Sequence, residues 1–113
     1  MEITTTEYSV KYDPEADTIS LQGSMRLNGH EYQTIMQFLE QVTALEPAML
    51  KLDLRQLKVL NSSGISMLGR FVFSLGKKQT IPLTIKGSHD IAWQDKWARN
   101  FQLLMPSLTL EWE

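Results

Sequence analysis

The chain has 113 residues, of which 42% are hydrophobic, and its 11 basic and 13 acidic side chains give a net charge of −2 without a single cysteine. A chain of this length and composition can bury one core, so a single domain over residues 1–113 is expected. The absence of cysteine excludes disulfides, thiolate nucleophiles and zinc sites built on cysteine. The nearly balanced charge gives no excess of basic residues that would attract nucleic acid or an anionic membrane.

Neither an export signal nor a membrane segment is visible. Residues 1–7 contain no basic region followed by an apolar run, and no stretch approaches the ~18 consecutive apolar residues typical of a spanning helix. We therefore expect a soluble, cytoplasmic protein whose partners are other proteins.

Two strands and a helix are predicted in the N-terminal half. Apolar and polar residues alternate over 8–12 and over 18–22, and the turn-forming segment 13–17 between them predicts a β-hairpin. Asn28 followed three residues later by Glu31 indicates a capped helix start. This helix ends before Pro47, and its apolar face consists of Tyr32, Ile35, Phe38, Leu39, Val42 and Leu45.

Three further strands and two helices are predicted in the C-terminal half. Apolar and polar residues alternate over 50–54, 81–86 and 108–112, with one helix from Ser62 to about Leu75 and another from about Asp90 to Met105 between them. Strand-helix-strand units are almost always parallel and right-handed. The predicted fold class is therefore α/β: a small mixed β-sheet, with the N-terminal hairpin joined to parallel strands and the helices mainly on one face.

The central helix separates into two faces on a helical wheel. The apolar face contains Ile65, Leu68, Phe71, Val72 and Leu75. The opposite face contains Ser63, Ser66, Arg70, Phe73, Ser74 and Lys77, with Met67 at its margin. A large aromatic on a polar face is a candidate anchor for a docked protein, although packing against the third helix or the chain terminus is the alternative for Phe73.

The start of this helix carries the sequence Asn61-Ser62-Ser63-Gly64. Backbone N–H groups in the first turn of a helix lack intrahelical acceptors, so this position favours an anion or a phosphorylated side chain. Plain helix capping by Asn61, Ser62 or Ser63 is the alternative interpretation.

Two stretches around this helix start resemble the core of the STAS family, the sulphate transporter and anti-sigma-factor antagonist domain. They are Val59-Leu60-Asn61-Ser62-Ser63-Gly64 and Leu68-Gly69-Arg70. The resemblance is strong over residues 49–77 and implies an anti-sigma-factor antagonist of a bacterial partner-switching system. It implies that Ser63 is the phosphorylated residue, whereas helix physics alone also allows Ser62. The family usually has aspartate where this chain has Asn61. Since Asn and Asp cap helices equally well, we expect Asn61→Asp to leave the melting temperature almost unchanged and to speed phosphorylation.

The implied function is non-enzymatic regulation of transcription by partner switching. The unmodified helix would bind an anti-sigma factor or serine-kinase-like protein, phosphorylation would release it, and a phosphatase would reverse the change. The expected partner-binding residues, besides Ser63, are Ser66, Met67, Arg70, Phe73 and Lys77. Two alternatives are a constitutive scaffold that self-associates as a homodimer, for example through its open sheet face, and a small-molecule sensor with a pocket near the motif.

No enzyme or cofactor signature accompanies the motif. Neither serine lies in a Gly-x-Ser-x-Gly elbow, and His30 and His89 fall in separate predicted loops. His89, Asp90 and Asp95 match no standard metal spacing, and Gly76-Lys77-Lys78 lacks the pattern of a nucleotide-binding loop. No metal or cofactor is therefore expected. An apolar stripe of the third helix is interpreted as core, namely Trp93, Trp97, Phe101 and Leu104.

Overall fold

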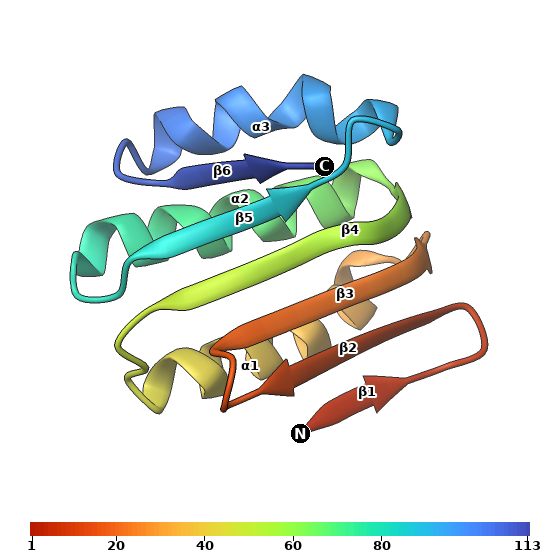
Figure 1. The fold of residues 1–113 in the computed structure, drawn as a ribbon. Coiled ribbons are helices and arrows are strands. Elements are labelled where there is room, and N and C mark those ends of the chain that lie inside the picture. Colours follow the sequence, from red (N-terminus) through yellow and green to blue (C-terminus); the bar gives the residue numbers. More distant parts are fainter.

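A computed structural model covers residues 1–113 and shows one six-stranded sheet whose strands lie in chain order (Figure 1). The strands are β1 (Glu2–Thr4), β2 (Tyr8–Asp13), β3 (Thr18–Met25), β4 (Leu50–Leu60), β5 (Leu83–Gly87) and β6 (Thr109–Trp112). The helices are α1 (Gly29–Ala44), α2 (Ser62–Lys78) and α3 (Ala92–Leu104). None of these helices is both long enough and apolar enough to span a membrane.

The sheet is mixed, as predicted. Strands β1, β2 and β3 pair antiparallel, whereas β3, β4, β5 and β6 pair parallel. In Figure 1, α1 and α2 lie behind the sheet and α3 lies along its β6 edge, and α2 packs against both other helices. The predicted fold class, an N-terminal hairpin plus parallel strands with helices on one face, is therefore confirmed. The sequence reading missed β1, a three-residue edge strand.

Several element boundaries differ from the prediction. Strand β4 continues to Leu60, and its second half pairs with β3 alone after a register shift opposite Ser20–Gln22. Helix α2 passes through Gly76 and ends where Gln79 adopts a left-handed φ of 56°. Helix α3 begins at Ala92, so Asp90 lies in the preceding turn.

The core lies between the sheet and the helices, and α2 contributes more to it than predicted. Met67 is fully buried, so its assignment to the partner-binding surface is wrong, while Ile65 is only half-buried. The physical reason is that α2 is the middle helix and has neighbours on both sides. Its buried stripe is consequently wider than that of a helix packed on a sheet alone.

The apolar stripe predicted for α3 is partly wrong for a related reason. Phe101 is buried and the half-buried Trp93 and Trp97 pack against the core, as predicted, but Leu104 is 39% exposed. The side of α3 that faces the sheet instead presents Gln94 and Ala98. As the last helix of the layer, α3 has a helical neighbour on only one side.

The open face of the sheet is polar. Across β4, β5 and β6, the neighbouring residues Asp53, Lys86 and Glu111 alternate in charge. Arg55 donates to both carboxylate oxygens of Asp53, at 2.8 and 3.0 Å, and also contacts Glu113 at 3.0 Å. Burial alone would raise the pKa of Asp53, but the hydrogen bonds from Arg55 outweigh burial and lower that pKa.

Two phenylalanines of α2 provide a matched test of this packing. Phe71 is 2% exposed and Phe73 is 48% exposed. We expect Phe71→Ala to reduce the free energy of unfolding by about 3–5 kcal/mol. Phe73→Ala should cost below about 1 kcal/mol, because a surface position leaves no sealed cavity. Denaturant unfolding of both variants measures the difference, and equal losses would place Phe73 in the core.

Candidate functional site

The predicted motif lies where β4 passes into α2. Asn61 is the N-cap, with an extended backbone (φ −81°, ψ 176°), and its Oδ1 accepts a hydrogen bond from the Gly64 N–H at 3.1 Å. Its main-chain carbonyl accepts the first helical bond, from Ile65 N at 3.0 Å. Asn61 alone therefore supplies the side-chain cap of α2.

The Asn61 side chain also links three other parts of the molecule. Its Nδ2 donates to the carbonyl of Leu27 at 2.8 Å, and its Oδ1 accepts from the Tyr32 hydroxyl at 2.7 Å. The orientation of the amide is fixed, because the Leu27 carbonyl only accepts and the Gly64 N–H only donates. Asn61 thus joins the β3–α1 connection, α1 and the first turn of α2.

Tyr32 supports this arrangement from inside the core. It is 1% exposed, and the Met25 carbonyl is a second acceptor 3.1 Å from its hydroxyl. Burial raises the pKa of Tyr32, because the interior disfavours the charged phenolate. The hydroxyl therefore stays a hydrogen-bond donor to Asn61 at neutral pH.

Gly64 permits the close approach between α2 and Tyr32. A methyl group added at Gly64 would lie 2.6 Å from the Tyr32 hydroxyl and would clash with the Leu60 side chain. The glycine of the motif consequently has a packing role, and its N–H donates to the Asn61 cap.

The two serines have no such structural role. Ser62 and Ser63 are exposed at the first two helical positions, and neither hydroxyl forms a hydrogen bond within the chain. Their backbone N–H groups have no main-chain acceptor, and the first turn contains no acidic residue. This helix end therefore has the free donors and the positive dipole end that a covalently attached phosphate favours.

The exposed face of α2 continues from these serines to the end of the helix. We call this face the α2 ridge, and it consists of Ser62, Ser63, Ser66, Arg70, Phe73, Ser74 and Lys77. All of these except Ser62 were placed on one face from the sequence, and Met67 is the residue removed from it. The Lys77 ammonium lies 5.6 Å from the centre of the Phe73 ring. The ridge thus combines acceptor hydroxyls, two cations and one aromatic.

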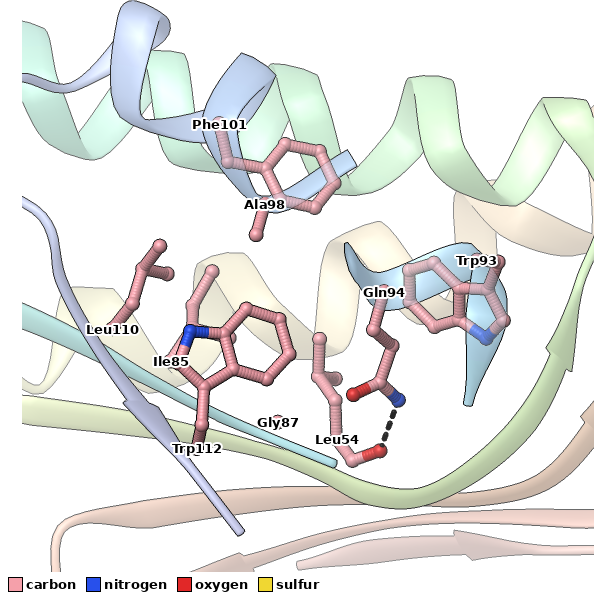
Figure 2. A pocket seen from close by; sticks show the side chains of 9 residues that line it. All are labelled: Leu54, Ile85, Gly87, Trp93, Gln94, Ala98, Phe101, Leu110 and Trp112. Carbon is pink, nitrogen blue, oxygen red and sulfur yellow. Dashed lines mark hydrogen bonds between the residues drawn. The ribbon is translucent and has the colours of Figure 1, made fainter. Parts of the chain in front are cut away.

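The structure offers little room for a small molecule beneath α3. Figure 2 shows a cavity of about 10 Å³, roughly the space of one water molecule. Gln94 lines it, and its Nε2 donates to the Leu54 carbonyl at 2.6 Å while its Oε1 accepts from Ser88 N at 2.8 Å. Sequence reasoning missed Gln94, because no pattern distinguishes a buried glutamine from an exposed one.

A wider depression lies beside the C-terminal end of β4. It has a volume of about 660 Å³, is open to solvent, and is lined in part by Arg55, Lys58 and Asp90. Arg55 is already paired with Asp53 and Glu113, and no group of three or more His, Asp or Glu side chains is placed to hold a metal ion. His89 contacts Asp95 at 3.3 Å and stacks on Trp112.

The geometry changes what we expect of Asn61→Asp. A carboxylate cannot donate, so the Leu27 carbonyl would lose its partner and face a negatively charged oxygen. We expect a loss of about 1–3 kcal/mol in the free energy of unfolding. Capping alone would instead predict an almost unchanged melting temperature. The matched control is Asn28→Asp, where the exposed Asn28 caps α1 through Oδ1 alone, and it should be nearly neutral. Equal melting temperatures for both variants would contradict the role of Nδ2.

Tyr32→Phe tests the buried hydroxyl through pH. A raised pKa means that the folded state holds the phenolic proton more tightly, so stability is present below the ordinary pKa of 10.0 and falls as pH rises above it. The variant should lose about 1–2 kcal/mol at neutral pH and show a smaller further loss at alkaline pH than the wild type. Urea unfolding between pH 7 and pH 11 provides the comparison. Parallel alkaline losses in the two proteins would show that Tyr32 does not titrate differently on folding.

No known protein family and no curated protein matches the sequence. Solved structures match its fold over nearly the whole chain. One is a chain in the crystal structure of the diguanylate cyclase SiaD in complex with its activator SiaC from Pseudomonas aeruginosa, with a TM-score of 0.75, 19% identity and coverage of 100% of this chain and 99% of that chain. Apo-SiaC of the same organism matches with a TM-score of 0.74 and 20% identity, over 100% of this chain and 97% of that chain. Another structure of SiaC from Pseudomonas aeruginosa matches with a TM-score of 0.71 and 18% identity, over 98% of this chain and 94% of that chain. At these identities the likeness establishes the fold, which is that of SiaC.

Proposed function

We propose that this chain is a non-enzymatic regulatory protein whose α2 ridge binds a signalling partner and whose phosphorylation at Ser63 releases it. One observation carries the proposal: Asn61 alone caps α2, so Ser62 and Ser63 are exposed and free of hydrogen bonds within the chain. The capping interpretation accounts for Asn61 and leaves the two serines without a structural reason to be there.

Electrostatics explains why phosphorylation of Ser63 would release the partner rather than bind it. A phosphoserine adds about −1.5 to −2 charges, and a helix N-terminus stabilises such a charge by up to ~1 kcal/mol in the free protein. In a complex, the same charge would sit at the edge of a packed interface and would have to lose its hydration. Phosphorylation therefore favours the dissociated protein on both counts.

The choice of Ser63 over Ser62 rests on the STAS-like motif. Both serines are exposed at the helix start. Ser63 occupies the position of the acceptor serine in the anti-sigma-factor antagonists that the segment around Asn61 resembles. In this scheme a kinase supplies the phosphoryl group and a phosphatase removes it, while this chain supplies the acceptor alone.

The partner class is drawn from two sources. The structural neighbour SiaC is described as the activator of a diguanylate cyclase, with which it forms a complex. The STAS-like motif points instead to an anti-sigma or serine-kinase-like protein. Because the SiaC likeness covers the whole chain, we propose a diguanylate cyclase as the first partner to test and a kinase-like regulator as the second.

The scaffold alternative receives less support from the structure. A constitutive dimer through the open sheet face would need apolar contact area there. That face contains alternating charges, including Asp53, Lys86 and Glu111, and none of the large exposed apolar residues lies in a strand. Binding that is indifferent to Ser63 would restore this alternative.

The decisive experiment follows phosphorylation and binding together. The protein is incubated with serine kinases and diguanylate cyclases purified from its source organism, and the modified residue is mapped by mass spectrometry. We expect phosphate on Ser63 in the wild type and in Ser62→Ala, none in Ser63→Ala, and at least tenfold weaker binding of the cyclase or kinase-like partner after phosphorylation.

The serine variants also supply the controls. Ser63→Ala should bind the partner as tightly as the wild type and should be insensitive to the kinase. Phosphate on Ser62, or equal affinity of the phosphorylated and unmodified proteins, would contradict the proposal.

A further inference from the structure

An apolar contact continues the α2 ridge onto α3. The side of α2 that faces α3 carries three residues spaced four and three positions apart, Gly69, Phe73 and Gly76. A methyl group at Gly69 would lie 3.5 Å from Leu104 Cδ1, and one at Gly76 would lie 3.1 Å from the Leu104 carbonyl oxygen. Leu104 therefore lies against the side of α2 that carries Phe73, and Leu104 and Phe73 are 39% and 48% exposed.

Two more apolar side chains of α3 are at least partly exposed. Leu103, next to Leu104, is 80% exposed, and the half-buried Trp97 lies one turn before Phe101, whose ring approaches Gly69. We call Phe73, Trp97, Leu103 and Leu104 the α2–α3 strip. Single exposed apolar residues are ordinary, whereas contiguous ones mark interaction sites.

Cations surround the strip although the whole chain is acidic. Helix α2 contains no acidic residue, and two of its three cations, Arg70 and Lys77, lie on the α2 ridge. On α3, the Lys96 ammonium lies 5.7 Å from the centre of the Trp97 ring. The Lys77 ammonium lies over the Phe73 ring in the same way. An approaching partner therefore meets apolar surface with positive charge at its margins.

We propose that the α2–α3 strip binds an acidic amphipathic helix of the protein partner. This inference rests on the proposed function and names the chemistry of the partner segment. The two helices run parallel, because both return between parallel strands, so a third helix could lie along them and contact the exposed apolar side chains of both. Apolar side chains of that helix would contact Phe73 and Leu104, and its acidic side chains would pair with Arg70 and Lys77.

The same arrangement explains how a distant phosphate weakens binding. Ser63 and Arg70 are two turns apart on one face of α2, a rise of about 10.5 Å. This separation is comparable to the ~8–10 Å screening length at physiological salt. A phosphate on Ser63 would therefore offset the cationic margin and repel an acidic helix.

Site-specific photo-crosslinking in the source organism tests the inference. Benzoylphenylalanine replaces Phe73 or Leu103, and a matched control places it at Lys11, an exposed residue of the open sheet face. We expect Phe73 and Leu103 to crosslink to one segment of the partner, which peptide mapping should identify as an acidic amphipathic helix. The Lys11 position should not crosslink to that segment.

Charge reversal on the purified pair adds a second readout. Arg70→Glu and Lys77→Glu should each weaken binding at least tenfold, and affinity should fall with added salt. Lys78→Glu is the matched control, because Lys78 faces the α1 side of the helix beside Met36 and Glu40 and should change affinity less than threefold.

The outcomes separate this inference from the proposed function. A crosslinked segment that is neutral or basic, a crosslink to a second copy of this chain, or charge reversals without effect would overturn the acidic helix and leave phosphorylation-controlled binding intact. A partner that binds but crosslinks only at Lys11 would also overturn it. Failure to bind any partner, or binding unaffected by Ser63 phosphorylation, would count against the proposed function itself.

Discussion

The side-chain amide of Asn61 is the interaction on which the candidate site depends. It uses its oxygen for Gly64 and Tyr32 and its nitrogen for Leu27, so that one residue fixes where α2 starts relative to α1 and to the end of β3. With the cap supplied by Asn61, the following two positions need no particular side chain for stability. The two serines there are consequently exposed and make no hydrogen bond within the chain.

The place of α2 in the helix layer determines the shape of the surface it presents. Neighbours on both sides bury Met67 towards the interior and leave only a narrow ridge in solvent. Along the α3 side, a methyl group at Gly76 would lie only 3.1 Å from the Leu104 carbonyl oxygen, so this glycine lets the two helices approach closely. Phe73 lies on the same side of α2 and is 48% exposed.

Local sequence patterns predicted most of the architecture. The hairpin, the three helices, the parallel strands and the cap at Asn61 all follow from periodicity, turn chemistry and capping, which act over a few residues. Features that depend on neighbours distant in the sequence were missed. The burial of Met67 requires knowing that α1 flanks α2. The hydrogen bond from Asn61 to Leu27, like that from Gln94 to Leu54, joins segments more than 30 residues apart.

The order of the strands has a consequence for how this chain reaches its fold. Because β1 to β6 lie in the sheet in the same order as in the sequence, every strand pairs with the one made just before it. The longest interval between paired strands is the α1 connection of 24 residues between Met25 and Leu50. Pairing of consecutive strands avoids longer chain closures, each of which would cost additional entropy. We therefore expect the sheet to grow strand by strand from the N-terminus as the ribosome releases the chain, with α2 docking once β4 provides a surface for it.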